Sequence, residues 1–365
     1  MQISQMFKRK PCVFSIECFP PKQTANFDKM KDTLRTMRTL NPDFISVTYG
    51  AGGSTGGVST VEVAEFLKND LNVEPLAHMI CMGSDKAKAA QLLDQLNAAG
   101  VRNVLTLRGD RTPTRPESPD FAHASDLAQF VWQTQPEFDI HAACYPEGHP
   151  EAATLAQDVA NLRFKQEAGA THLLTQLFFD NMHFYRFLNL ARRAGITLPV
   201  SAGVMPIVKR SQIERTVALS SASLPSEFTR MISRYQDDPE SLYAAGIDYA
   251  VQQLRDLIEG GADGVHLYAM NDAKVAAAVY EGIKDLLKSA CWPHRGGVKR
   301  CAISLPAKRY PRRNPSLPWG RGLAAGCCIP GAAAKSRGRP ARRRHPARRV
   351  ETAAADRPAA AERRE

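Results

Sequence analysis

Eight short runs rich in β-branched and aromatic residues alternate with longer amphipathic runs over the first 288 residues of this 365-residue chain. Glycine, proline or asparagine stands at the junctions, where strands and helices are expected to end. Strands that alternate with helices form a parallel sheet, and eight such units favour closure into a barrel over an open, doubly wound sheet. The sequence therefore predicts an α/β fold, a single-domain (β/α)8 TIM barrel over residues 1–288.

The boundaries of these elements follow from the periodicity and from the junction residues. The predicted strands are 13–18, 43–48, 73–79, 101–107, 138–144, 171–177, 198–203 and 264–268. The predicted helices are 26–40, 58–71, 85–99, 125–133, 151–168, 181–194, 210–221, 241–259 and 273–288. The connection 221–240 is the longest, and we expect it to hold a loop and an extra helix near the mouth of the barrel.

The composition changes abruptly after residue 288. Residues 289–365 carry 19 Lys and Arg against 4 Asp and Glu, whereas the first 288 residues carry 29 against 33, so the basic charge belongs to the tail. The tail lacks any sustained periodicity and cannot build a core, so it is expected to be disordered. It could be a nucleic-acid-binding arm, a solvated tail without a role, or an out-of-frame translation. We favour the last, because the change falls inside a predicted helix.

The cysteines before the tail, Cys12, Cys18, Cys81 and Cys144, form no Cys-x-x-Cys pair and match no zinc spacing, so reduced thiols are expected. Residues 1–10 lack the apolar core of a signal peptide, and no run of about 18 apolar residues is present to span a membrane. A cytoplasmic location without membrane partners is expected.

Glu17 ends the first predicted strand, and Pro20 and Pro21 then stop that strand. Burial among Phe14, Ile16 and Phe19 would disfavour the ionised carboxylate and raise its pKa, which allows a glutamate to donate a proton near neutral pH. The alternative is a structural glutamate that pairs with a lysine or is solvated.

Seven of the eight predicted strands end in a residue that can bond a polar ligand, and the active site of this fold lies at the C-terminal strand ends. These residues are Glu17, Thr48, His78, Arg108 with Asp110, Tyr145, Gln176 and Tyr268. Each has an ordinary structural alternative: Thr48 as a strand residue, His78 as a satisfied core histidine, Tyr145 as a rim aromatic. Their common position at one rim favours a site.

A glycine-rich stretch, residues 48–57, follows the second strand and precedes a helix, a context that suits close approach to a phosphate or a flavin. It lacks the Gly-x-Gly-x-x-Gly spacing of a standard dinucleotide fold. On the predicted helix 151–168, Asp158, Asn161 and Lys165 form one stripe, which would face solvent unless the helix lies along a bound nucleotide. No metal site is expected, since His78, His141, His149 and Cys144 match no standard spacing.

Several segments together resemble methylenetetrahydrofolate reductase, the bacterial-type flavoenzyme barrel, and they occur in family order over about residues 12–288. The matching segments are SIECFPP (15–21), FISVTYGAGGST (44–55), AH (77–78), LRGD (107–110), AACYPEGHPE (142–151), NLRFK (161–165), AGATHLLTQLFFD (168–180) and HLYAMN (266–271).

The resemblance implies reduction of 5,10-methylenetetrahydrofolate to 5-methyltetrahydrofolate, which supplies methyl groups for methionine synthesis. NADH or NADPH would reduce FAD, and the two substrates would take turns on the flavin in a ping-pong cycle. Glu17 would protonate the folate N10, Asp110 would hold the pterin beside the flavin, Gln176 would pair with the pterin amide, and Tyr268 would line the folate or nicotinamide side. The residues expected to hold FAD are Thr48, Tyr49, His78, Arg108, Gly109, Asp110, His123, Ala124, Tyr145, His149, Asp158, Asn161 and Lys165.

Four residues at three sites depart from the family pattern. Relatives commonly carry charged residues where this chain has Gly56 with Gly57, Phe164 and Asp272. At the last of these sites the residue in relatives is frequently arginine. They affect the expected contacts to FAD phosphate and folate, but not the chemistry. A homo-oligomer and no specific nucleic-acid partner are expected. The alternatives are another FAD-dependent barrel, such as a proline dehydrogenase, or a protein that binds nucleic acid through its basic tail.

Overall fold

The computed structural model describes residues 1–49, 57–111, 115–213, 216 and 222–288 of the chain. The predicted tail, 289–365, lies outside the described residues, as does most of the glycine-rich stretch. Within the described ranges, no helix is long and apolar enough to cross a membrane.

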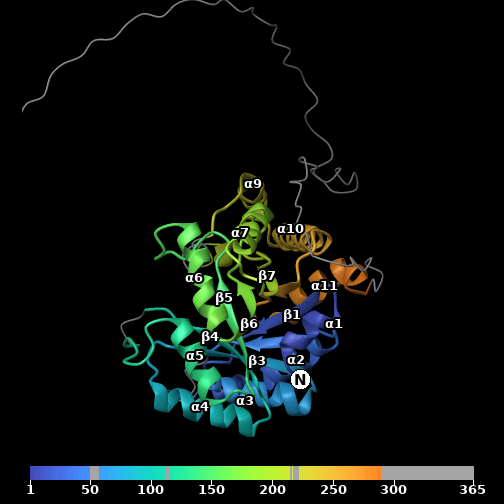
Figure 1. Cartoon of the computed structure of the whole chain (residues 1–365). Coiled ribbons are helices and arrows are strands. Elements are labelled where there is room, and N and C mark those ends of the chain that lie inside the picture. The colour runs from blue at the N-terminus through green and yellow to red at the C-terminus, as the bar shows by residue number, and fades with distance from the viewer. Residues whose placement is uncertain (50–56, 112–114, 214–215, 217–221, 289–365) are drawn as a thin grey trace, which may run out of the picture. The chain divides into compact units, whose positions relative to one another are not determined.

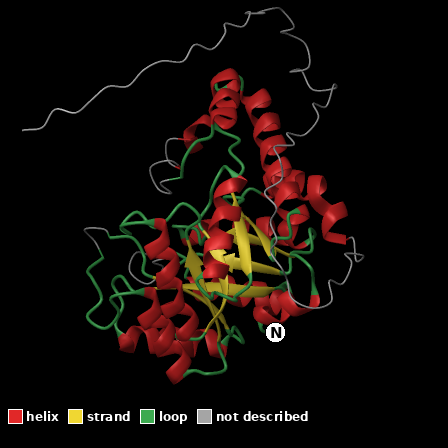
Figure 2. Cartoon of the chain, turned by 45° about the horizontal axis from the view of Figure 1, so that its top comes forward, coloured by secondary structure: helices red, strands yellow, loops and turns green. Residues whose placement is uncertain are grey.

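Eight parallel strands close into a barrel in chain order, and helices surround it (Figure 1 and Figure 2). The last strand pairs with the first in the register Val13↔Gly264 to Ile16↔Leu267, which closes the sheet. The predicted (β/α)8 barrel is therefore confirmed. The strands are β1 (Val13–Cys18), β2 (Phe44–Val47), β3 (Glu74–Ile80), β4 (Asn103–Leu107), β5 (Asp139–Cys144), β6 (Ala170–Thr175), β7 (Val200–Val204) and β8 (Gly264–Leu267).

The helices follow the predicted ranges with small shifts that have local causes. The predicted helix 151–168 begins only at Leu155, because Thr154 caps it by accepting a hydrogen bond from the Gln157 N–H. The predicted helix 210–221 lies largely outside the described residues. The main helices are α2 (Phe27–Arg38), α3 (Thr60–Glu65) with a π turn η3 (Phe66–Asp70), α4 (Lys86–Ala98), α5 (Ala124–Thr134), α6 (Leu155–Glu167), α7 (Asn181–Arg193), α10 (Pro239–Glu259) and α11 (Ala273–Lys288).

The long connection between β7 and α10 contains the expected extra helix, α9 (Ser226–Tyr235). Phe228, Met231 and Ile232 of α9 pack in one apolar cluster with Phe179 and Met205, which follow β6 and β7. The helix therefore packs against the segments that follow β6 and β7, near the mouth of the barrel, as predicted.

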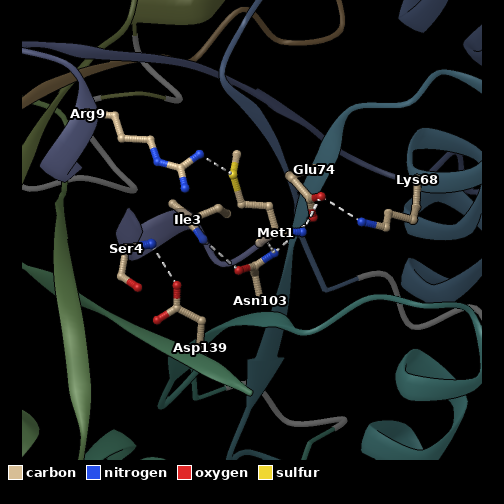
Figure 3. A network of polar contacts seen from close by, with 8 residues as sticks. All are labelled: Met1, Ile3, Ser4, Arg9, Lys68, Glu74, Asn103 and Asp139. Atoms are coloured by element: carbon tan, nitrogen blue, oxygen red, sulfur yellow. Dashed lines mark hydrogen bonds and ion pairs between the residues drawn. The ribbon is translucent and has the colours of Figure 1, made fainter. Parts of the chain in front are cut away.

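The N-terminal segment closes the opposite end of the barrel, which the sequence analysis did not anticipate (Figure 3). Residues Ile3–Gln5 (η1) and Met6–Arg9 (α1) form short helical turns, and Ile3 and Met6 are buried in the cluster that fills the barrel floor. The Ile3 N–H donates to Asn103 Oδ1 (2.9 Å) and the Ser4 N–H to Asp139 Oδ2 (2.7 Å), at the first residues of β4 and β5.

Candidate active site

A cavity of about 400 Å³ lies at the C-terminal ends of the barrel strands. Among the described residues, every strand except β7 lines this cavity with a residue of the strand itself or of the loop that follows it. Parallel strands bring their C-terminal ends to one face, so residues far apart in the sequence converge there. The predicted site residues that line the cavity are Glu17, Thr48, Tyr49, His78, Arg108, Gly109, Asp110, Tyr145, His149, Gln176 and Tyr268.

Glu17 lies at the end of β1 with its side chain 18% exposed, and it lines this cavity. Burial raises the pKa of Glu17 to about 8, so the carboxyl group is protonated at neutral pH. Among the described residues it has neither a lysine partner nor a hydrogen bond, which argues against the structural alternative for this glutamate. A carboxyl group that keeps its proton at neutral pH and faces a cavity can act as a general acid.

The apolar surroundings of Glu17 differ from those expected. Alternate side chains of a strand point to opposite faces, so Phe14 and Ile16 lie on the other face of β1, and the Phe14 ring contacts Tyr280 of α11 (ring centroids 5.7 Å apart). The expectation that these two residues enclose Glu17 is therefore wrong. The aliphatic side chains that line the cavity with Glu17 are Ile80, Leu105, Leu107 and Leu174.

Two buried histidines lie near the Glu17 carboxyl group, but neither is within hydrogen-bond distance. The distance from Glu17 Oε2 is 3.9 Å to His78 Nε2 and 4.0 Å to His266 Nε2. Burial lowers the pKa of each histidine to about 3, so both are neutral at pH 7. Ser15 Oγ contacts His266 Nδ1 at 2.7 Å, and Ser46 Oγ contacts His266 Nε2, the nitrogen nearer Glu17, at 3.4 Å.

Polar groups on β6 and β8 line another part of the cavity. Gln176 lies just after β6, one residue beyond the end of the strand, and its Oε1 accepts a hydrogen bond from the Leu177 N–H (2.9 Å). The amide nitrogen of Gln176 is then available to donate to a ligand. The Tyr268 hydroxyl donates to the Thr175 carbonyl (2.7 Å), which fixes the ring at the cavity wall.

A cationic region lies around the end of β4. Arg108 forms a two-point ion pair with Glu151, one contact being 2.9 Å, and Arg115 lies over the Tyr49 ring at 5.7 Å. Gly109 has φ +84°, and a Cβ atom there would lie 3.2 Å from the Ile80 Cβ, so glycine suits this turn. Arg115 and Glu151 were not predicted from the sequence, although both are charged and follow the ends of predicted strands.

The other residues expected to hold FAD lie outside the cavity lining. On α6, Lys165 donates to the Ala143 carbonyl (2.7 Å), and burial lowers its pKa. The solvent-facing alternative therefore does not hold for Lys165, and its contact with a bound nucleotide stays a prediction. Asp158 accepts from the His149 N–H (3.1 Å), which holds the loop after β5 against α6. Asn161 is exposed and accepts from Gln157. His123 is exposed at the start of α5, and Ala124 is buried beside it.

The cavity is suited to a flavin nucleotide in two respects. His78 Nε2 and Arg108 Nε are buried and have no hydrogen-bond partner in the described part of the chain. The histidine nitrogen can donate to or accept from a ligand according to its tautomer, whereas the Arg108 Nε–H can only donate. Arg108 and Arg115 supply the positive charge that a pyrophosphate requires. Within the described residues, no group of three or more metal-ligating side chains is close enough to hold a metal ion.

Comparisons with known proteins give a consistent result. The family model described as methylenetetrahydrofolate reductase matches residues 2–284. The chain is 33% identical over 281 residues to a "Probable methylenetetrahydrofolate reductase (NADH)" of Oryza sativa subsp. japonica; the match covers 73% of the chain but only 47% of that protein. It is 29% identical over 267 residues to the 5,10-methylenetetrahydrofolate reductase of Escherichia coli, with 73% of the chain and 88% of that protein covered.

The chain thus spans about half the length of the plant relative and most of the bacterial one. Among solved structures, an uncharacterized protein from Clostridium thermocellum, described as binding two copies of 5-methyl-5,6,7,8-tetrahydrofolic acid, has a TM-score of 0.57 at 12% identity. That match covers 78% of the chain and 100% of the solved protein, and it shows a shared fold.

Proposed function

Because the chain belongs to the methylenetetrahydrofolate reductase family, we propose that it reduces 5,10-methylenetetrahydrofolate to 5-methyltetrahydrofolate with NADH or NADPH as the hydride donor. The observation that carries the proposal is the position of Glu17, whose carboxyl group lines the cavity at the C-terminal end of the barrel, where burial raises its pKa to about 8. The names of the plant and bacterial relatives support the reaction, and the folate ligand of the Clostridium thermocellum protein supports the substrate class.

The proposal includes FAD as the resident cofactor. Bound FAD would accept a hydride from the nicotinamide and later deliver a hydride to the folate, so the two substrates would occupy the cavity in turn. Arg108 and Arg115 would bind the pyrophosphate, and His78, Tyr145 and His149 would contact the cofactor from the ends of β3 and β5. Thr48, Tyr49 and Gly109 complete this side of the cavity.

Glu17 would act as the general acid. Its proton would pass to N10 of the folate, which opens the five-membered ring to a cationic iminium. The two neighbouring histidines are neutral and do not compete as acids at pH 7. Asp110 would stabilise the cation through its negative charge, and the free amide nitrogen of Gln176 would donate to the pterin.

The test separates the two half-reactions in Glu17→Gln, which keeps the shape of the side chain but removes its proton. We expect flavin in this variant to be reduced by NADH at close to the wild-type rate, and the reduced flavin to persist when methylenetetrahydrofolate is added. Glu167→Gln, an exposed glutamate on α6, is the matched control. Equal loss of both half-reactions would make Glu17 structural, and wild-type protein that binds no FAD would contradict the proposed function.

The remaining expectations stay proposals. These are the homo-oligomer, the cytoplasmic location, the lack of a specific nucleic-acid partner, and the separation of the chain into a catalytic barrel and a tail at residue 288.

A further inference from the structure

We infer that Asn271 is a positioning residue for Glu17, and that it acts through the backbone of Phe19. The Asn271 side chain accepts a hydrogen bond from the Phe19 N–H (3.1 Å) and donates one to the Phe19 carbonyl (2.8 Å). These two bonds join the loop after β8 to the chain just beyond β1, across 252 positions in sequence. The inference rests on the proposed function, because it assigns a role in placing the proposed general acid.

The two bonds lie where the pairing of β1 with β8 has ended. The register between these strands stops at Ile16↔Leu267, whereas on the other side β1 stays paired with β2 as far as Cys18↔Val47. Beyond this register, the Asn271 side chain bonds the Phe19 backbone on the β8 side. Glu17 is itself paired with Ser46 on the β2 side, and on the β8 side its span is held by the register up to Ile16 and by the Asn271 side chain at Phe19.

The side chain of Glu17 has no hydrogen bond of its own to fix it in the described structure. Its nearest ring nitrogens, in His78 and His266, are 3.9 and 4.0 Å away. The direction of the carboxyl group must then follow from the position of its backbone and from contact with the cavity wall. A proton donor has to lie within hydrogen-bond distance of its acceptor, so a small displacement of the backbone costs rate.

The conformation of the loop after β8 explains why asparagine suits this position. Met270 and Asn271 both have left-handed backbones, with φ of +54° and +56°. Asparagine adopts this conformation more readily than most residues, whereas methionine does so at a cost in conformational energy. The Asp272 N–H donates to the Ala269 carbonyl (2.9 Å), and Asp272 Oδ1 caps α11, so both ends of the loop are fixed.

Asparagine also has the right chemistry for both bonds. A backbone N–H needs an acceptor and a backbone carbonyl needs a donor, and a side-chain amide carries one of each in a single plane. Aspartate has the same size but cannot donate at neutral pH. Asn271→Asp should therefore keep the bond from the Phe19 N–H, lose the bond to its carbonyl, and place a negative charge there.

The experiment measures the two half-reactions separately in the full-length, FAD-loaded protein with Asn271→Ala and Asn271→Asp. We expect the rate of flavin reoxidation by methylenetetrahydrofolate to fall about 10-fold or more in Asn271→Ala, and less in Asn271→Asp. Flavin reduction by NADH should change little. The fall in the folate half-reaction at high pH should begin at a lower pH, because a mobile Glu17 is better hydrated.

Asn41→Ala is the matched control. Asn41 is also a left-handed asparagine (φ +51°), but its side chain bonds to Arg38 and Thr39 in an exposed loop between α2 and β2. The Asn41→Ala variant should leave the rates of both half-reactions and the pH profile of the folate half-reaction unchanged. Equal loss of both half-reactions in the Asn271 variants, or an unchanged folate half-reaction and pH profile, would overturn the inference.

The outcomes also separate this inference from the proposed function. If wild-type protein does not reduce methylenetetrahydrofolate at all, the proposed function fails. If the wild type is active and Asn271→Ala matches it, only the role of Asn271 fails. Should Asn271→Ala not fold, Asn271→Asp decides the question, since it keeps the size of the side chain and one of the two bonds.

Discussion

The ring of Tyr268 lies directly over the backbone of Gly203. A Cβ atom at residue 203 would come within 2.5 Å of Tyr268 Cε2 and 2.9 Å of its hydroxyl oxygen. The hydroxyl group donates to the Thr175 carbonyl, and the Gly203 N–H donates to Thr175 Oγ1 (2.9 Å). The missing side chain on β7 thus allows a tyrosine from β8 to reach across to β6 at the wall of the cavity.

Gly203→Ala should displace Tyr268 and lower the rate of the folate half-reaction by about 10- to 100-fold, because the added methyl group cannot fit. The measurement is stopped-flow reoxidation of the flavin, together with FAD affinity, which should change little. Tyr268→Phe removes only the hydroxyl group and should have a smaller effect. A Gly203→Ala variant with wild-type kinetics would show that the position of Tyr268 is unimportant.

The pH dependence should differ between the two half-reactions. The pKa of Glu17 is about 8, so its proton is present below this pH and lost above it, and the folate half-reaction should slow as the pH rises past about 8. Flavin reduction by NADH needs no proton from Glu17 and should show no such fall. The rates of both half-reactions between pH 6 and about 10 test this. If the rates of both half-reactions fell together as the pH rises, Glu17 would not be the proton donor of the folate half-reaction.

The raised pKa of Glu17 also makes the free energy of unfolding depend on pH. In the unfolded chain Glu17 titrates near its ordinary pKa of 4.5, whereas in the folded protein it does so near 8. Its contribution to the free energy of unfolding is therefore fully present below pH 4.5 and is lost as the pH rises through 8. Glu17→Gln should lack this component in urea unfolding measured across the range.

Arg108→Lys should weaken FAD binding by about 10-fold, because a lysine ammonium cannot keep the two-point ion pair with Glu151 and also present the separate N–H that Arg108 Nε offers to a phosphate. Fluorescence titration of the flavin-free protein measures the affinity. Arg163→Lys is the control, since Arg163 also pairs with a glutamate, Glu167, but lies exposed on α6. Unchanged FAD affinity in Arg108→Lys would place the phosphate away from this residue.

Asp139→Asn should lower the free energy of unfolding by roughly 2 to 4 kcal/mol, because a buried and hydrogen-bonded charge is removed. Burial alone would raise the pKa of Asp139, but the nearby His141 ring (3.5 Å) and hydrogen bonds from the Ser4 N–H and the Thr171 hydroxyl outweigh it and hold the pKa below its usual range. This stabilisation is present above the ordinary pKa of 3.8 and is lost as the pH falls.

Urea unfolding near pH 7 and near pH 3 tests this, and the difference between wild type and Asp139→Asn should shrink at the lower pH. Asp32→Asn is the control, since Asp32 is exposed on α2 and pairs with Arg35. An equal effect of both substitutions would mean that the contacts between β5 and the N-terminal segment contribute little to stability.

The sequence by itself determined the alternation of strands and helices, the closed barrel that follows from it, and the rim on which Glu17, Asp110, Gln176 and Tyr268 would meet. These features depend on local periodicity and on the parallel direction of the strands, both of which can be read along the chain.

Only the tertiary structure decided what surrounds these residues. It placed Leu105 and Leu174 around Glu17 in place of Phe14, buried Lys165 against Ala143, and brought Asn271 to Phe19. It also put Ile3 and Met6 into the barrel floor. Such contacts join residues that are distant in sequence, and they depend on side-chain direction, strand register and packing volume, none of which leaves a periodic signal in one chain.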